Sequence, residues 1–280
     1  MMRPSIEMET AYTKRGDNGE MAPKPYRWLA RYYDDLFPFH LSWFENARRE
    51  ALGEILPRTQ VACDLGCGTG TTAVRLAAQG IRMYGVDVSE EMCKGARAKA
   101  RQAKQRLRVV QADMRDFHLP EPVDLVLCEF DALNHVPEKS DLGRVLESVA
   151  AALRPGGYFY FDVNMRLALE SVWPGTWFRE QPGMAVVMNS SFDEATERCV
   201  TDIQWFLQKG ALWKREQESV EQVCWTDEEI RAGLGATGFG EVSAWDALPF
   251  FTGDSSILPG CCTFYRARKD FTCAGEGSQA

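Results

Sequence analysis

The chain has 280 residues, enough for one enlarged α/β domain or for one domain that carries an insertion. Hydrophobic residues make up 45% and charged residues 26%, a balance that excludes a disordered or fibrous protein. The net charge of −8 argues against a nucleic-acid-binding protein, whose affinity comes mainly from basic residues against phosphates. No secretory signal or membrane-length apolar run is visible, so we expect a cytoplasmic protein without a membrane segment.

Predicted elements begin after a polar arm, with an aromatic segment at residues 26–39 and a helix from about Ser42 to Leu56. From residue 61, short apolar runs alternate with amphipathic helical runs. The expected strands are 61–65, 82–88, 107–112, 123–129 and 158–163, and the expected helices are 69–79, 89–104 and 142–153. Ser89 and Ser140 are the expected N-caps of the last two helices. This alternation predicts an α/β fold with a parallel, doubly wound sheet.

The alternation ends after Asn164. The next runs predict three or four antiparallel strands with a solvated face, whose aromatic side chains seal them against the main sheet. Thr226 and Glu229 carry the signature of a capping box, which starts a helix that ends at Gly238, and strands follow near 239–246 and 261–268. The predicted parts are a flexible arm at 1–24, a core at 25–175 and 226–269, an insert at 176–225 and a flexible tail at 270–280.

A glycine-rich turn joins the first predicted strand to its helix, in the run Asp64-Leu-Gly66-Cys-Gly68-Thr-Gly70. Alternate glycines let the backbone turn sharply and approach a ligand without a Cβ clash. The spacing differs from the GxGxxG of NAD enzymes, because position 71 is Thr. The carboxylate of Asp64 would repel a pyrophosphate but suits an ammonium group. The turn therefore argues against a nicotinamide-dependent oxidoreductase, which stays as an alternative.

Acidic residues also end the following predicted strands. Asp87 ends the second strand, where a carboxylate suits ribose hydroxyls. Asp113 and Met114 follow the third strand and suit the exocyclic amine and the face of an adenine. Glu129 ends the fourth strand. The loop after it holds Asp131, Asn134 and His135. Because open α/β sheets bind ligands at the carboxyl ends of their strands, we expect these side chains to share one site.

Together and in this order, the motifs resemble those of the class I S-adenosylmethionine-dependent methyltransferases. The run from Asp64 to Gly70 is similar to the first motif of that family, and Leu153-Arg-Pro-Gly-Gly157 to its link into the fifth strand. Tyr33-Asp34-Asp35-Leu36 and the insert are similar to the bacterial small-molecule branch, which includes nucleotide-sugar N-methyltransferases and glycine N-methyltransferase. The resemblance covers residues 26–268. It implies a seven-stranded, mostly parallel, Rossmann-like sheet with a small antiparallel β insert after strand five.

The resemblance also implies S-adenosylmethionine as the cofactor. Gly66 and Gly68 would contact its methionine part, with Asp64 orienting the loop. The other implied contacts are Asp87 on the ribose hydroxyls, Asp113 and Met114 on the adenine, Glu129 beside the cofactor amine and the transferred methyl, and Tyr33 and Trp43 as a cover from the N-terminal helices.

The implied reaction is methyl transfer to a nitrogen or oxygen of a small molecule, by a monomer or homodimer. His135 is the candidate general base, and Trp177 and Phe178 of the insert are candidates for lining the substrate pocket. No metal site is expected, because well-placed oxygen ligands are not visible. A non-catalytic cofactor-binding scaffold stays as an alternative. So does methylation of RNA or protein through the basic run from Lys94 to Arg108, which we interpret as a solvated helix face.

Overall fold

The computed structural model describes residues 26–38, 40–251 and 258–271. The predicted arm at 1–24 and residues 272–280 of the predicted tail lie outside this description. None of the helices described within these ranges is both long and apolar enough to cross a membrane.

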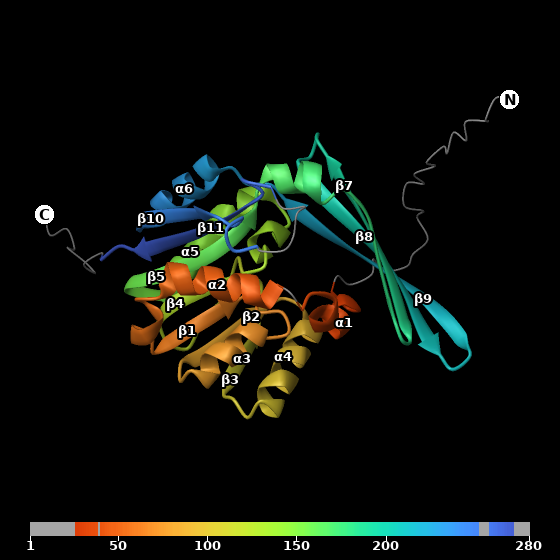
Figure 1. The fold of residues 1–280 in the computed structure, drawn as a ribbon. Helices are drawn as coiled ribbons and strands as arrows, with labels where there is room; N and C mark the ends of the chain where they lie inside the picture. Colours follow the sequence, from red (N-terminus) through yellow and green to blue (C-terminus); the bar gives the residue numbers. More distant parts are fainter. Residues whose placement is uncertain (1–25, 39, 252–257, 272–280) are drawn as a thin grey trace, which may run out of the picture.

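A seven-stranded sheet forms the centre of the molecule, in the order β10-β11-β5-β4-β1-β2-β3 (Figure 1). Its strands are β1 (Val61–Leu65), β2 (Arg82–Asp87), β3 (Leu107–Gln111), β4 (Val123–Cys128), β5 (Leu153–Asn164), β10 (Phe239–Asp246) and β11 (Cys262–Lys269). Neighbours among β1 to β5 pair in parallel, whereas β11 runs antiparallel to both β5 and β10. The predicted mostly parallel, doubly wound sheet is confirmed.

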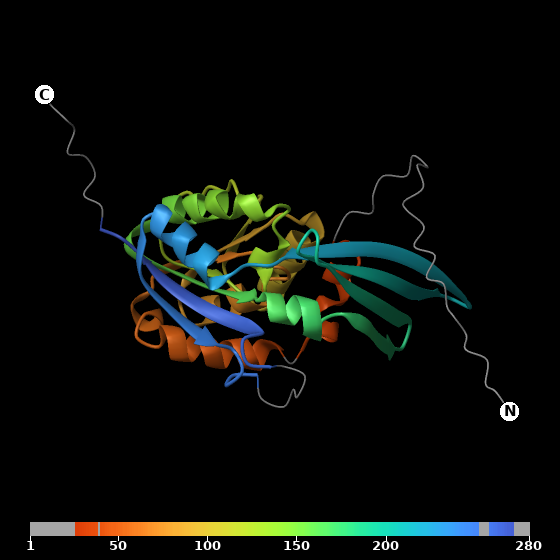
Figure 2. The same cartoon turned by 90° about the horizontal axis from the view of Figure 1, so that it is seen from above.

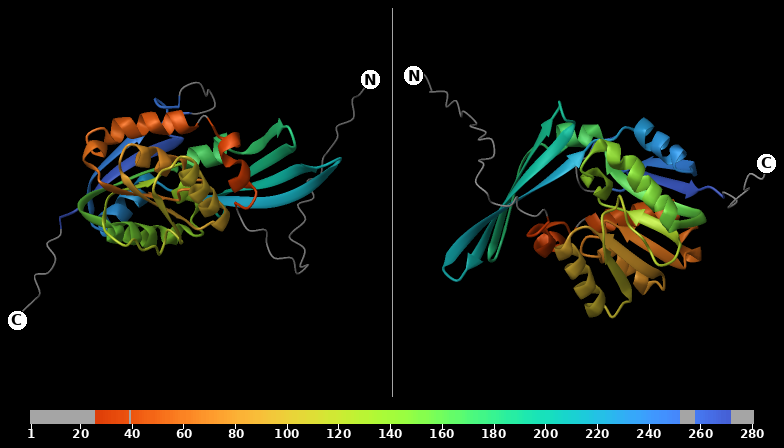
Figure 3. Two further views of the ribbon diagram at one scale, coloured as in Figure 1. Left: turned by 90° about the horizontal axis from the view of Figure 1, so that it is seen from below. Right: turned by 180° about the vertical axis from the view of Figure 1, so that it is seen from behind.

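Helices cover both faces of this sheet (Figures 1 and 3). They are α2 (His40–Leu52), α3 (Thr71–Ala78), α4 (Glu90–Gln102), α5 (Leu142–Ala152) and α6 (Asp227–Ala236), whereas α1 (Leu29–Leu36) packs on the insert. Side chains of α2 and α3 form one hydrophobic cluster with the sheet, and those of α5 and α6 form another. Val145, Leu146 and Val149 of α5 are fully buried, because their spacing places them on one helix face.

Two of the three expected helix caps are confirmed. Ser89 accepts a hydrogen bond from the amide of Met92 at the start of α4, and Thr226 and Glu229 form the reciprocal capping box of α6. The expectation for Ser140 is wrong, because this residue lies in a short 3-10 helix and the N-cap of α5 is Asp141. α6 also ends at Ala236, before the predicted end at Gly238.

The insert is a four-stranded antiparallel sheet that projects from the core (Figure 2). Its strands, in spatial order, are β6 (Gly175–Gln181), β7 (Met184–Asp193), β8 (Arg198–Lys209) and β9 (Leu212–Val223). Trp205 on its inner face is fully buried and stacks on Tyr32 of α1, with ring centroids 5.4 Å apart. The expectation that insert aromatics seal against the main sheet is therefore corrected for Trp205, which packs on α1.

The helix α1 lies between the core and the insert (Figure 3). At its start, the amides of Trp28 and Leu29 donate to the carboxylate of Glu218 on β9, at 3.1 and 2.7 Å. Further along, Asp34 accepts hydrogen bonds from Lys99 of α4, at 2.6 Å, and from Thr69 of the glycine-rich turn, at 2.8 Å. The helix is thus attached to the insert at one end and to the core at the other.

Candidate cofactor and acceptor site

A cavity of about 1430 Å³ lies at the carboxyl ends of β1 to β5, bounded by α1 and the insert. Pockets for a single small ligand typically enclose about 300–1,000 Å³, so this cavity has room for two. Eleven of the predicted site residues line it: Tyr33, Trp43, Asp64, Gly66, Gly68, Asp87, Asp113, Met114, Glu129, His135 and Trp177.

Phe178 is the predicted site residue that the structure does not bring to the cavity. It follows Trp177 on β6, and successive side chains of a strand point to opposite faces. Its side chain is on the outer face of the insert and is 59% exposed. The prediction that Phe178 contributes to the pocket is therefore not supported by the geometry.

The glycine-rich turn forms the floor of the cavity beneath the tips of the strands. Gly66 and Gly68 have φ angles of +69° and +52°, which L side chains rarely adopt. A Cβ on Gly66 would lie 2.7 Å from the Cβ of Ala132. Asp64 is buried, and its Oδ2 accepts a hydrogen bond from the amide of Ala73 in the first turn of α3, at 3.1 Å. Asp64 therefore ties the strand to the helix across the turn.

Asp87 connects the tip of β2 to both of its neighbours. Its Oδ2 accepts from the amide of Gly68 and its Oδ1 from the amide of Ser89, each at 2.8 Å. Burial raises the pKa of Asp87, against the effect of these two hydrogen bonds. The carboxylate thus has a fixed orientation at the point where the turn and the start of α4 meet.

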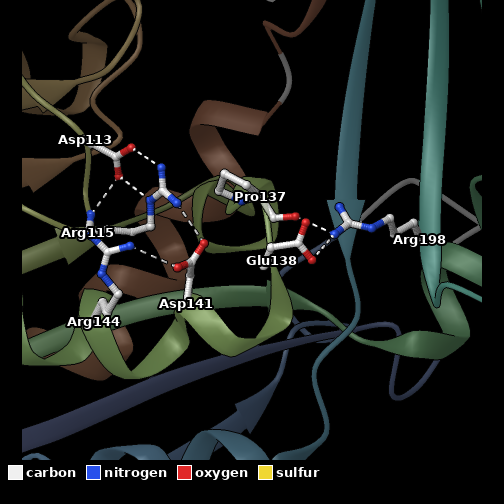
Figure 4. A network of polar contacts seen from close by, with 7 residues as sticks. All are labelled: Asp113, Arg115, Pro137, Glu138, Asp141, Arg144 and Arg198. Carbon is white, nitrogen blue, oxygen red and sulfur yellow. Dashed lines mark hydrogen bonds and ion pairs between the residues drawn. The ribbon is translucent and has the colours of Figure 1, made fainter.

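Asp113 is held by an arginine two residues further along the chain (Figure 4). Its Oδ1 accepts from the amide and Nε of Arg115, at 2.9 and 3.0 Å, and its Oδ2 accepts from Nη2 at 2.7 Å. These bonds lower the pKa of Asp113, so the carboxyl is ionised at neutral pH. Arg115 also pairs with Asp141 at 2.8 Å, which joins this cluster to the start of α5.

Glu129 is paired with an arginine that the sequence analysis did not select. Nε and Nη2 of Arg48 on α2 donate to its two carboxylate oxygens, at 2.8 and 2.7 Å, and Thr72 donates to Oε2 at 3.2 Å. The side chains of Arg48 and Glu129 are only 7% and 2% exposed. The charge of Glu129 is therefore compensated within the protein.

Aromatic rings of the N-terminal segment cover the cavity. Tyr33 lies 5.2 Å from Phe37, which stacks on Trp177 of the insert at 6.3 Å (ring centroids). Trp43 packs on Phe251 at 5.0 Å. Tyr33, Phe37 and Trp177 form an aromatic wall between α1 and β6.

His135 lies at the end of the cavity nearest the insert. Its Nδ1 is 3.0 Å from the carbonyl oxygen of Glu221, so we assign the proton to Nδ1. Nε2 then accepts from Nε2 of Gln222 at 3.3 Å. Burial lowers the pKa of His135 to about 4, so the ring is neutral at neutral pH.

Asp131 lies beside His135 in the same loop. It accepts hydrogen bonds from the side-chain amides of Asn164, at 2.9 Å, and Gln222. Burial raises its pKa to about 7. Local sequence marked Asp131 only as a polar loop residue, because both partners come from strands more than thirty residues away along the chain.

Comparison with known proteins identifies the family. A protein-family model described as a methyltransferase domain matches residues 62–157. A protein of Bacillus subtilis named methyltransferase YqeM is 32% identical over 221 residues, which are 76% of this chain and 86% of that protein. The chain belongs to the methyltransferases.

Solved structures agree with this methyltransferase in fold. An S-adenosylmethionine-dependent methyltransferase from Clostridium acetobutylicum has a TM-score of 0.73 at 21% identity, over 88% of this chain and 99% of that one. The sugar N-methyltransferase KedS8 from a Streptoalloteichus species has a TM-score of 0.68 at 19% identity, over 93% and 98%. CalS10, an amino pentose methyltransferase solved with bound S-adenosylmethionine, has a TM-score of 0.64 at 20% identity, over 91% and 100%.

Proposed function

We propose that this enzyme methylates a nitrogen or oxygen of a small molecule that binds between the strand tips, α1 and the insert. The observation that carries the proposal is the cavity itself, whose volume of about 1430 Å³ exceeds what the cofactor needs and whose far wall is the insert. The likeness to KedS8, a sugar N-methyltransferase, supports a small acceptor.

The residues at the strand tips fit S-adenosylmethionine as the cofactor. Gly66 has no room for a Cβ against Ala132, which supports a turn built for close approach of a ligand to the backbone. We assign Gly66 and Gly68 to the methionine part, with Asp64 holding the loop in place. Further assignments are Asp87 to the ribose hydroxyls, Asp113 and Met114 to the adenine, Glu129 to the vicinity of the cofactor amine, and Tyr33 and Trp43 to the cover.

When bound, S-adenosylmethionine would supply a methyl group on a sulfonium sulfur for transfer to the acceptor. The protein aligns the acceptor with the methyl–sulfur bond and excludes water, and positioning of this kind can lower a reaction barrier by up to about 7–11 kcal/mol. Trp177 and the aromatic wall provide the dry surface on the acceptor side. His135, the candidate base from the sequence, is a neutral hydrogen-bonding group at the end of the cavity nearest the insert.

The basic run on α4 does not favour RNA or protein as the acceptor. Lys94 pairs with Glu90 and Glu91, and Lys99 pairs with Asp34 of α1. Part of its charge is therefore compensated by neighbouring carboxylates. A small-molecule acceptor remains the better explanation of the enclosed cavity.

Thermal unfolding with added ligand tests the proposal. S-adenosylhomocysteine at 100 times its dissociation constant should stabilise the wild type by about 2.7 kcal/mol and raise the midpoint by a few degrees. The variant Asp87→Ala should lose that shift, measured from its own ligand-free midpoint, whereas Asp202→Ala on the exposed face of the insert should keep it. A shift with NAD in place of the adenosyl ligand, or an unchanged shift in Asp87→Ala, would contradict the assignment.

A further inference from the structure

Two carboxyl groups lie close together beside His135, on neighbouring strand tips at the end of the cavity nearest the insert. Asp131 follows β4 and Asp162 lies near the end of β5, and both line the cavity together with His135 and Gln222. The side chain of Asp131 is 27% exposed. We refer to Asp131, Asp162, His135 and Gln222 as the acidic corner.

The backbone at Asp131 is held in an unusual conformation. Phe130 and Asp131 have φ angles of +61° and +51°, two consecutive non-glycine residues in the left-handed region. The amide of Asp131 donates to Oδ2 of Asp162 at 2.9 Å, which fixes this turn. Strained backbone of this kind is typical of functional sites, where the surrounding structure holds a side chain in place.

Asp162 gives a second indication that the acidic corner is a binding site. Its side chain is buried, with 1% of the residue exposed. Its Oδ1 has no hydrogen-bond partner within the usual geometric limits among the residues that the structure describes, although the backbone of Phe130 lies close enough to act on the pKa of this carboxyl. Buried polar atoms in proteins are nearly always paired, and this unpaired oxygen belongs to a residue that lines the cavity.

The acidic corner differs from three other acidic positions of the cavity, whose charges are compensated by basic partners. Glu129 pairs with Arg48, Asp113 with Arg115 and Asp34 with Lys99. Neither Asp131 nor Asp162 forms an ion pair with a lysine or arginine in the described part of the chain. The aromatic wall, formed by Tyr33, Phe37 and Trp177, bounds the same cavity. Uncompensated carboxyl groups and aromatic faces are the groups that recognise an organic ammonium ion.

We propose that the acceptor is an amine and that Asp131, not His135, binds its ammonium form and takes its proton. This inference rests on the proposed function. An O–H bond forms on Asp131 as one N–H bond of the ammonium breaks, and the neutral nitrogen keeps its lone pair. That pair forms the bond to the methyl carbon, and the electron pair of the methyl–sulfur bond stays on sulfur. The product is a methylated ammonium ion, and Asp131 returns its proton to water.

The protonation behaviour of the corner agrees with this division of roles. A general base works best when its pKa lies near the working pH. Burial raises the pKa of Asp131 to about 7, whereas burial lowers that of His135 to about 4. The charge of Asp131 raises the pKa of several groups that face it, and His135 of its own loop lies 3.8 Å from its Oδ2. The groups so affected are Tyr26 and Tyr33 of the N-terminal segment, Asp162 of β5, Cys199 of β8 and Cys262 of β11.

Titration calorimetry with a matched pair of probes tests the proposal. Cyclohexylammonium and cyclohexanol are nearly equal in size but differ in charge. With S-adenosylhomocysteine bound, the wild type should bind cyclohexylammonium at least tenfold more tightly than cyclohexanol. At about pH 6, in two buffers of different ionisation enthalpy, binding of the ammonium should release about one proton, and at about pH 8 almost none, because Asp131 is then already ionised.

The variant Asp131→Asn should lose both the preference for the ammonium and the proton release. Asn tolerates the left-handed backbone of this position, so the variant keeps the turn. His135→Gln and the exposed-face control Asp202→Asn should keep the proton release. Equal binding of the two probes by the wild type, unchanged proton release in Asp131→Asn, or its loss in His135→Gln would overturn the inference. Failure of S-adenosylhomocysteine to bind the wild type would instead contradict the proposed function.

Discussion

At the scale of single residues, Arg48 and Glu129 show how the protein places a carboxylate at the edge of the cavity without leaving an uncompensated charge. The guanidinium reaches from α2 to the tip of β4 and makes two parallel hydrogen bonds. Planar, bidentate pairing of this kind suits arginine and is not reproduced by lysine. Transfer of both charges from water is costly, so the pair stabilises the fold only while both partners are present.

The variant Arg48→Met should lower the free energy of unfolding by about 3–5 kcal/mol, because it leaves the carboxylate of Glu129 buried without a partner. Urea unfolding at neutral pH measures this loss. Arg75→Met is the matched control, since Arg75 pairs with Glu45 where both side chains are about half exposed, and it should cost less than about 1 kcal/mol. Equal losses in the two variants would show that burial of the pair has no special energetic role.

Individual site residues could be predicted from the sequence where the signal lies in the residues next to them along the chain. Asp64, Asp87 and Glu129 each end an apolar run, and that position alone predicts a side chain at the ligand-binding edge of the sheet. Arg48 and Gln222 gave no such signal. Their partners, Glu129 and Asp131, lie 81 and 91 residues away, and only the folded chain brings them together.

At the scale of elements, α1 joins the two parts of the cavity wall. A helix of eight residues is too short to be stable by itself in water, so its position depends on its contacts. Glu218 accepts from the amides of Trp28 and Leu29 and also from Nε1 of Trp205, at 2.9 Å. Carboxylates at a helix start satisfy amides that have no partner within the helix.

The variant Glu218→Gln should free the start of α1, because an amide nitrogen replaces one of the accepting oxygens. Hydrogen exchange followed by mass spectrometry should show faster exchange in residues 28–36, by about tenfold for the loss of roughly 1.4 kcal/mol. Glu216→Gln is the control on the same face of β9, where the side chain pairs with Lys214. Unchanged exchange in Glu218→Gln would show that side-chain packing alone holds the helix.

The sequence pattern predicted the elements of the insert but not what they contact. The polar run KREQESVEQ indicated a solvated face, and strand alternation does place Gln217 and Ser219 outward. The same alternation places Glu218 inward, against α1, where its burial raises its pKa. A buried carboxylate cannot be told from its exposed neighbours by residue type, so the docking of α1 on the insert was not predictable.

At the scale of the whole molecule, buried ionisable groups make stability depend on pH. Burial raises the pKa of Asp131 to about 7 and, with the nearby Glu129 carboxylate, that of Asp64 to about 8. The folded state then binds more protons than the unfolded state, so the stability these groups contribute is complete below their ordinary pKa near 4 and is lost as pH rises through 7 and 8. His135 acts in the opposite sense, because its lowered pKa favours the folded state above about pH 6.5.

The variant Asp131→Asn should remove one of these contributions. Its free energy of unfolding relative to the wild type should increase from about pH 5 to about pH 7 and then level off, because the wild type alone is penalised by an ionised carboxyl there. Urea titrations across this range measure the difference. A difference that stays flat across this pH range for Asp131→Asn would refute the expectation.

The hydrogen bonds that the amides of Trp28 and Leu29 donate to Glu218 also constrain the order in which a newly made chain can fold. Along the chain, Trp28 and Leu29 are 190 and 189 residues away from Glu218. At translation rates of about 5–20 residues per second, roughly 10–40 s pass between synthesis of the first helix and synthesis of its anchor. During that interval the first aromatic segment has emerged from the ribosome with no β9 to receive it. Docking of α1, which closes the cavity, is therefore among the last events in the biogenesis of this enzyme.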